Sequence, residues 1–244
     1  MAEKMNKKHF WNWTQNGVTD EKTGEIAVER ALHLYGTIAP ESWFEDDVTP
    51  SMFKEELEAE DGPVTVYINS PGGDCVAASQ IYTMLMEYGH PVTVKIDGIA
   101  ASAASVIAMA GSAVLMSPTA LMMCHNPATM AFGDHGEMEK AIDMLDSVKE
   151  SILNAYEIKT GLDRDTLSKM MDEETWMDAT KAIELGFADG MIPSSVSDAH
   201  SMADKASPVL FSQKSVDKAL VNRLKASSGI PVGPLYQRLE RLKP

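Results

Sequence analysis

Hydrophobic and polar positions along residues 29–110 predict strands that alternate with helices. Residues 29–36 alternate between apolar and polar side chains and end at a glycine, a pattern typical of a strand. Residues 64–69 and 92–96 are rich in β-branched side chains and predict two further strands. Between them, residues 75–88 carry apolar side chains at the spacing of an amphipathic helix. This order indicates an α/β fold in which parallel strands are joined by right-handed helical crossovers.

The pattern after residue 99 adds short strands and a long helix. An alanine-rich helix is expected at residues 100–110, followed by strands at 113–116 and 121–124. Residues 136–160 place apolar side chains three and four positions apart, which predicts a long helix with one buried stripe. A last strand is expected at residues 187–192.

Changes in composition divide the chain into three predicted parts. Residues 1–28 form an N-terminal arm with an aromatic cluster, which either docks on another surface or packs as a strand or staple on its own domain. Residues 29–192 form the α/β domain. Residues 193–244 are a tail rich in Pro, Ser and Ala, which is typical of a linker, and its last segment, 234–242, has a helical pattern.

Charge separates the domain from the tail. The chain carries 21 basic and 36 acidic residues, a net charge of −15. Residues 1–192 hold 13 basic and 32 acidic groups (−19), whereas residues 193–244 hold 8 and 4 (+4). Because nucleic-acid binding depends on Lys and Arg that neutralise phosphates, this acidic domain argues against a nucleic-acid partner.

The cysteine content, the N-terminal segment and the lengths of the apolar runs favour a cytoplasmic protein. The two cysteines, Cys75 and Cys124, do not make a disulfide framework and favour a reducing compartment. The N-terminus mixes charges with aromatic residues, unlike a secretory signal, and no uninterrupted apolar run has the ~18 residues of a membrane span. We expect no membrane contact, no cofactor, and no metal because paired Cys/His ligand spacing is missing. Since no P-loop pattern occurs, we also expect that no nucleotide is bound by that route.

Two turns that follow predicted strands could carry chemistry. Gly72 and Gly73 stand where the backbone must turn with positive φ or approach a ligand closely, although most Gly-Gly pairs are only tight turns. Ser102 opens the alanine-rich segment, where unpaired N–H groups favour an oxyanion nearby. A serine at this position is more often a simple helix cap. Ser105 is the alternative nucleophile, but it would lie deeper in the helix.

A nucleophilic serine needs a base and a group that orients it. His125 closes an apolar strand, and a strand end can deliver a side chain to a cleft, although a histidine there is usually structural. Carboxylates that could orient the imidazole occur at residues 172–174, where a solvated acidic helix start is the simpler explanation.

Taken in order, these motifs resemble the ClpP family of serine peptidases, and most closely its phage-type branch, the Clp-like head maturation (prohead) proteases. The resemblance covers about residues 32–192. The matching segments are Ile68-Asn69-Ser70-Pro71-Gly72-Gly73, Ala101-Ser102, His125-Asn126-Pro127, Glu174-Thr175-Trp176 and Ala182-Ile183-Glu184-Leu185-Gly186-Phe187-Ala188-Asp189.

The resemblance implies a role for each matched residue. Ser102 would be the nucleophile and His125 the general base, and the backbone N–H groups of Gly73 and Ala103 would form the oxyanion hole. Counting back from the glycine of the last motif places the family's aspartate position on Glu174, with Asp172 as the alternative acid.

The resemblance also implies an architecture and partners. The fold would be the ClpP/crotonase-like α/β fold, with a parallel sheet and with residues 136–160 as a protruding handle helix between stacked seven-membered rings of this same chain. A Clp ATPase feeds such rings in housekeeping members. For the phage branch, the substrates would be the scaffold and major capsid protein, cleaved during head maturation with or without an ATPase, in the host cytoplasm or inside the prohead.

Three other functions remain open at this point. One is a housekeeping proteolytic core fed by a Clp ATPase. Another is a crotonase-fold enzyme that is not a peptidase, which would lack the serine and histidine pair. The last is an inactive ring or scaffold protein with a vestigial site.

Overall fold

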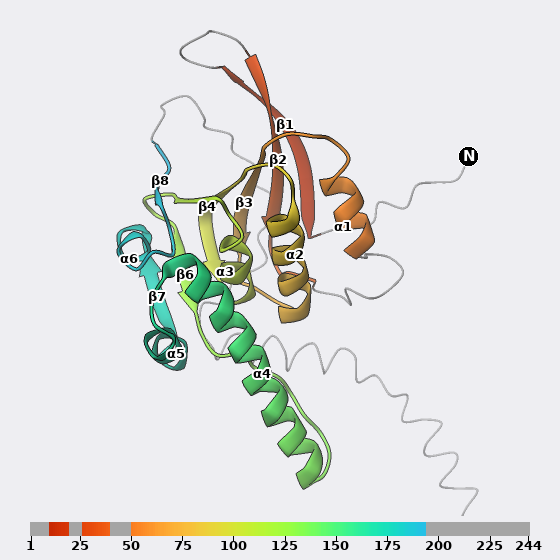
Figure 1. The fold of residues 1–244 in the computed structure, drawn as a ribbon, viewed down its shortest axis with the longest axis vertical. Helices are drawn as coiled ribbons and strands as arrows, with labels where there is room; N and C mark the ends of the chain where they lie inside the picture. Colours follow the sequence, from red (N-terminus) through yellow and green to blue (C-terminus); the bar gives the residue numbers. More distant parts are fainter. Residues whose placement is uncertain (1–9, 20–25, 40–49, 194–244) are drawn as a thin grey trace, which may run out of the picture. The chain divides into compact units, whose positions relative to one another are not determined.

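The computed structural model describes residues 10–19, 26–39 and 50–193, which form a mixed α/β domain around one branched sheet (Figure 1). The strands run in the order β1-β2-β3-β4-β5-β8, and β6 pairs with β4 and β7 with β6 as a side branch. The strands are β1 (Trp11–Thr19), β2 (Ile26–Tyr35), β3 (Val64–Ser70), β4 (Val92–Ala101), β5 (Ala113–Met116), β6 (Leu121–Cys124), β7 (Thr175–Asp178) and β8 (Gly190–Met191). The helices are α1 (Pro50–Leu57), α2 (Cys75–Glu87), α3 (Ala103–Ala108), α4 (His135–Thr160), α5 (Arg164–Asp172) and α6 (Ala179–Glu184).

The predicted parallel arrangement is confirmed for the centre of the sheet. Strands β2, β3, β4, β5 and β8 pair in parallel, and α2 connects β3 to β4. The alternate residues Val64, Val66 and Ile68 of β3 are buried. Since these side chains contribute to the same hydrophobic core as α1, α2 and α3, burial of apolar surface fixes the register of the central strands.

The N-terminal arm, where it is described, is part of the sheet. Strand β1 pairs with β2 in antiparallel fashion, and the buried Trp11 ring lies edge-on to Phe53 of α1. The alternative that the arm packs as a strand on its own domain therefore holds for residues 11–19, and the predicted boundary at residue 28 falls inside β2. Residues 1–9 and the tail from residue 194, including the helix expected at 234–242, lie outside the described residues.

The segment around Gly98 differs from the sequence-based prediction. A strand ending at residue 96 and a helix from residue 100 to 110 were expected, but β4 continues to Ala101 and α3 spans only Ala103–Ala108. Residues 99–101 pair with β6, and a register shift lets Ala100 pair with Ser70 of β3. These ladder hydrogen bonds outweigh the helix propensity of alanine, which is a weak preference of a few tenths of a kcal/mol to about 1 kcal/mol per residue.

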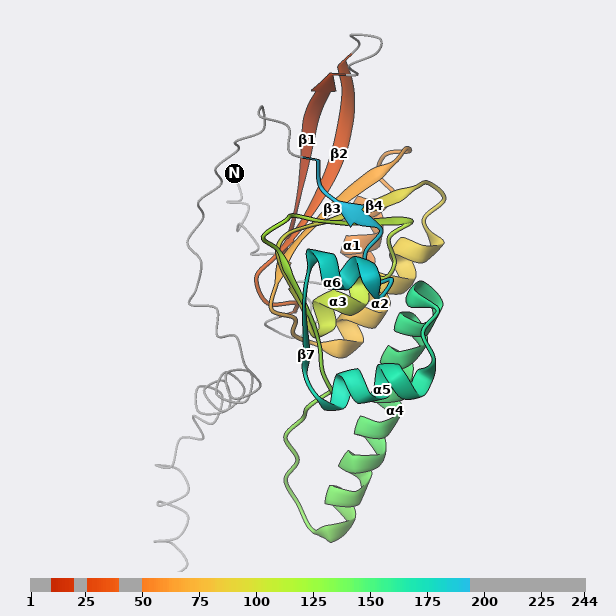
Figure 2. The same cartoon turned by 90° about the vertical axis from the view of Figure 1, so that its left-hand side faces the viewer.

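The long helix α4 begins and ends at clear sequence signals. The Asp134 carboxylate accepts a hydrogen bond from the N–H of Glu137, and Gly161 ends the helix with a φ of 69°. The expected buried stripe is present only in the second half, where Ile152, Leu153, Ala155 and Tyr156 are buried. The first half projects beyond the sheet (Figures 1 and 2), and Met138, Ile142 and Met144 are exposed. No described helix is long and apolar enough to cross a membrane.

Candidate active site

Ser102 lies on a strained turn between β4 and α3. Its φ of 56° and ψ of −126° are unusual for a residue with a side chain and cost roughly 1–3 kcal/mol. The Ser102 N–H donates to the carbonyl oxygen of Met123 at 2.9 Å, which ties the turn to β6. In α/β-hydrolases, a sharp strand-to-helix turn exposes the hydroxyl of a serine.

His125 follows β6 directly and reaches this serine. Because β6 pairs with the last residues of β4 (Ala101 with Met123), the two strands end side by side. The His125 Nε2 atom lies 2.7 Å from Ser102 Oγ, although the residues are 23 positions apart in the sequence. The imidazole is largely buried, with 6% of its surface exposed. A neutral imidazole at this distance can accept the hydroxyl proton and so activate the oxygen as a nucleophile.

The Gly72-Gly73 turn packs against the serine turn. Gly72 has a φ of 96°, and a Cβ atom there would lie 2.8 Å from Ser102 Cβ and 3.0 Å from the backbone nitrogen of Ala103. Gly73 has a φ of 152° and forms a β-bridge with Ile38, whose oxygen would lie 2.2 Å from an added Cβ. Close backbone approach therefore requires both glycines, as expected from the sequence, and this packing accounts for them with or without a catalytic role.

The two acidic candidates have different surroundings. In the antiparallel β6–β7 pair, Cys124 stands opposite Thr175, so continuing the register by one residue places Glu174 opposite His125. Glu174 has a φ of 51°, and its Oε1 accepts a hydrogen bond from the indole of Trp176 at 3.1 Å.

Asp172 is held by other groups. Its Oδ1 accepts hydrogen bonds from Asn126 Nδ2 at 2.8 Å and from Lys149 Nζ at 2.6 Å. The hydrogen bonds from Lys149 and Asn126 hold the pKa of this carboxyl below its usual range. Asp172 therefore contacts the residue after His125 and the middle of α4.

Ser105, the alternative nucleophile, is completely buried and already hydrogen-bonded. Its Oγ lies 2.6 Å from the carbonyl oxygen of Ser102 and 2.8 Å from the hydroxyl of Tyr156. Cys124 is also unsuited to nucleophilic attack, because burial raises the pKa of its thiol to about 12. Of the nucleophilic side chains at this site, Ser102 is therefore the one with a base in contact.

Several residues of the site gave no usable signal in the sequence. Tyr156 is one apolar position among many in the stripe of α4, and it lies 51 residues from Ser105. Ile38 and Met123 act through backbone groups, which any residue could supply. Their roles depend on strand pairing and helix packing, which sequence spacing does not reveal.

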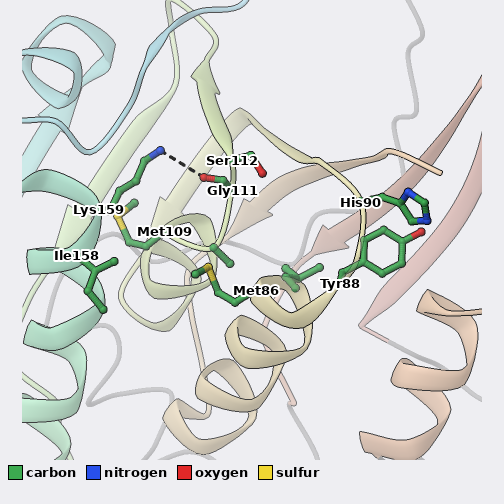
Figure 3. A pocket seen from close by; sticks show the side chains of 10 residues that line it. Met86, Tyr88, His90, Met109, Gly111, Ser112, Ile158 and Lys159 are labelled. Atoms are coloured by element: carbon green, nitrogen blue, oxygen red, sulfur yellow. Dashed lines mark hydrogen bonds between the residues drawn. The ribbon is translucent and has the colours of Figure 1, made fainter. Parts of the chain in front are cut away.

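A separate hollow lies away from these residues (Figure 3). It has a volume of about 280 Å³ and is lined by the ends of α2, α3 and α4, including Met86, Tyr88, Met109 and Ile158. The Lys159 side chain lies at the edge of this hollow, and its Nζ donates to the carbonyl oxygen of Gly111 at 3.3 Å. Neither Ser102 nor His125 lines this hollow. Within the described residues, no group of His, Cys, Asp and Glu side chains could hold a metal ion.

Comparison with known proteins identifies relatives of one kind. The family described as "Clp protease" matches residues 15–195. The "ATP-dependent Clp protease proteolytic subunit 1" of Chlamydia muridarum is 30% identical over 141 residues, which cover 56% of this chain and 73% of that protein. The "ATP-dependent Clp protease proteolytic subunit" of Bdellovibrio bacteriovorus is 31% identical over 158 residues, 61% of this chain and 74% of that protein. The matched region contains every strand from β2 to β8 and all six helices of the described residues.

Proposed function

The chain belongs to the Clp protease family, and on this premise we propose that it is a serine endopeptidase with Ser102, His125 and Glu174 as its catalytic triad. The observation that carries the proposal is the 2.7 Å contact between Ser102 Oγ and His125 Nε2. The strained serine turn and the glycine turn packed against it support it, because a Cβ atom on Gly72 would lie 3.0 Å from the backbone nitrogen of Ala103, one of the two nitrogens assigned to the oxyanion hole.

The proposed reaction follows the general scheme of serine hydrolases. Ser102 Oγ attacks the carbonyl carbon of the peptide bond while His125 Nε2 takes its proton. The N–H groups of Gly73 and Ala103 stabilise the negative oxygen of the tetrahedral intermediate. The C–N bond then breaks and the protonated imidazole gives its proton to the leaving amine. Water, deprotonated by the same imidazole, releases the acyl group and restores the Ser102 hydroxyl.

We assign the third position to Glu174 and not to Asp172. The β6–β7 register places Glu174 opposite His125, whereas Asp172 is engaged with Asn126 and Lys149. A carboxylate beside the imidazole fixes its tautomer and stabilises its protonated form. Glutamate is one methylene longer than the family's aspartate, and it stands here on a backbone with a φ of 51°.

A fluorophosphonate probe tests the nucleophile. It should label the wild-type protein and fail to label Ser102→Ala. A matched control is Ser147→Ala, which removes an exposed serine hydroxyl from α4 and should label like wild type. Labelling that persists in Ser102→Ala would refute the assignment. Cleavage of unstructured casein by the same preparations separates an active peptidase from an inactive ring scaffold, which would assemble without cleaving.

We further propose that the protein assembles into stacked seven-membered rings through α4 as the handle helix. The support is the projecting first half of α4, where Met138, Ile142 and Met144 are exposed in the single chain. Burial of such side chains by a second copy would contribute about 25 cal/mol per Å² of apolar surface.

For the biological role we propose cleavage of phage scaffold and major capsid protein during head maturation. Support comes from the resemblance of the aromatic N-terminus, the alanine- and serine-rich segment 101–111 and the long tail to the phage-type branch. The test is incubation with purified scaffold and capsid protein in the absence of ATP, with defined cleavage products expected. The location would be the host cytoplasm or the prohead interior.

A housekeeping proteolytic core is the second candidate, and it is favoured by the similarity to bacterial proteins named as proteolytic subunits of ATP-dependent Clp proteases. It predicts that degradation of folded substrates requires a Clp ATPase and ATP, and that capsid proteins are not preferred. The third candidate, a crotonase-fold enzyme that is not a peptidase, is disfavoured by the contact between Ser102 and His125.

A further inference from the structure

A buried chain of hydroxyl groups connects α4 to the backbone of the serine turn. The Tyr156 hydroxyl lies 2.8 Å from Ser105 Oγ, and Ser105 Oγ donates to the Ser102 carbonyl oxygen at 2.6 Å. Ser105 and Tyr156 are 0% and 1% exposed. Since a serine hydroxyl has a single proton and Ser105 gives it to the carbonyl, Tyr156 must be the donor to Ser105. The chain therefore runs in one direction, from Tyr156 through Ser105 to Ser102.

Both ends of the Ser102 residue are fixed by hydrogen bonds. Its N–H donates to Met123 on β6, and its carbonyl accepts from both the N–H and the hydroxyl of Ser105. The bond from the Ser105 N–H, at 2.9 Å, is a backbone contact at the start of α3. The second bond, from the hydroxyl, fixes the direction of the carbonyl.

The direction of this carbonyl also sets the direction of the next N–H. The peptide unit between Ser102 and Ala103 is planar and trans, so its C=O and N–H bonds point in opposite directions. When Ser105 draws the carbonyl inward, the Ala103 N–H points away from it, toward the side on which Gly72 packs. This N–H is the one assigned above to the oxyanion hole.

We propose that Tyr156 and Ser105 are positioning residues that aim the Ala103 N–H at the developing oxyanion by holding the Ser102 carbonyl. The proposal rests on the proposed peptidase function. Burial raises the pKa of the Tyr156 phenol, so the phenol remains protonated and able to donate at any pH at which the enzyme works. Neither hydroxyl touches the substrate, because both are buried behind the turn.

The double variant Ser105→Ala/Tyr156→Phe is the most direct test. It removes both hydroxyls together, so neither is left buried without a partner, and the Ser102 carbonyl keeps its bond from the Ser105 N–H; the change in stability should therefore be small. With casein, kcat should fall on the order of tenfold, less than the loss of a whole oxyanion donor, and KM should stay within about twofold. The rate of fluorophosphonate labelling should fall by the same factor as kcat, because the tetrahedral phosphonyl adduct also places an oxygen in the hole.

Two single variants test the Tyr156 hydroxyl alone and, as a control, a nearby hydroxyl that has no link to Ser102. Tyr156→Phe keeps the ring that packs edge-on to Phe187 and should lower kcat by about threefold, since the bond from Ser105 to the carbonyl remains. Thr160→Val is the matched control: its hydroxyl donates to the Tyr156 carbonyl within α4 at 2.7 Å and has no link to Ser102, so kcat should stay at the wild-type value.

The outcomes separate the two proposals. A wild-type protein that neither cleaves casein nor reacts with the probe would refute the peptidase function itself. An active wild type together with unchanged kcat and labelling rate in both Tyr156→Phe and the double variant would overturn the positioning role alone. A rise in KM with unchanged kcat would also overturn it, because an oxyanion donor acts on the transition state.

Discussion

Gly72 and Ser102 pack so closely that a side chain on the glycine would collide with the serine. A Cβ atom on Gly72 would lie 2.8 Å from Ser102 Cβ and 2.7 Å from the Ala101 carbonyl oxygen, and the glycine has a φ of 96°. The turn after β3 and the turn after β4 therefore form one unit, in which each restricts the other.

Gly72→Ala should accordingly disable the enzyme. The added methyl group would displace the Ser102 turn, and an error of about 1 Å in a catalytic group can cost on the order of 100-fold in activity. We expect at least this loss in kcat/KM for casein. Gly62→Ala is the control for backbone strain alone, because Gly62 also has positive φ (122°) but no atom within 4 Å of an added Cβ. Equal losses of activity in the two variants would mean that strain, and not contact with Ser102, explains the effect.

If Glu174 is the carboxylate that orients His125, substitutions at Glu174 and at Asp172 should affect activity differently. Glu174→Gln should lower kcat by roughly 100-fold or more, because the amide cannot stabilise the protonated imidazole. Glu174→Asp should retain much of the wild-type activity, since aspartate tolerates positive φ and keeps the negative charge. Asp172→Asn should keep most of the activity. Steady-state kinetics of the three variants decide the assignment, and a large loss in Asp172→Asn with an active Glu174→Gln would transfer the role to Asp172.

If the projecting first half of α4 lies between rings, a charged side chain introduced there should change how the rings assemble. Ile142 is 58% exposed in the single chain. If it packs between rings, Ile142→Glu would bury a charge and should convert double rings into single rings or smaller species, as measured by analytical ultracentrifugation. Asp146→Asn, also on the exposed part of α4, should sediment like wild type. Unchanged sedimentation of Ile142→Glu would remove α4 from the ring interface.

The ion pair of Asp172 with Lys149 predicts a pH dependence of stability. Because the pKa of this carboxyl is lowered in the folded protein, the folded state binds fewer protons than the unfolded chain at acid pH. The stabilisation is present above the unfolded pKa, about 3.9, and is lost as the pH falls through the lower folded value. The Tm difference between wild type and Asp172→Asn should therefore narrow from pH 7 to pH 3. A constant difference would show that the charge of Asp172 does not contribute.

The sequence predicted those parts of the fold that depend on local patterns. The α/β order and the extent of the long helix follow from the periodicity of apolar positions. Ser102 and His125 were each weak candidates alone, and their contact required the pairing of β4 with β6. Their assignment therefore rested on the resemblance to a family as much as on the residues.

The errors have a common physical cause. Alanine favours helix, but residues 99–101 are held in β4 by hydrogen bonds to β6 that sequence windows do not include. The apolar stripe of α4 was expected along the whole helix, and within the single chain it is buried only in the second half, while burial of the first half depends on the proposed ring assembly. The Tyr156–Ser105 contact joins residues 51 positions apart, and nothing in either local pattern signals it. In each case a long-range contact decides what the local sequence leaves open.

The branch in the sheet has a practical consequence for modifying this protein. On one side β4 pairs with β3 as far as Ala100, and on the other side it pairs with β5 up to Ile96 and with β6 from Ile99, where β6 leads to His125. Strand β1 forms the edge of the sheet next to β2, and neither strand pairs with β4 or β6. A reporter domain inserted between Thr19 and Ile26 would thus be attached to the edge strands, and no strand pairing that joins Ser102 to His125 would be interrupted.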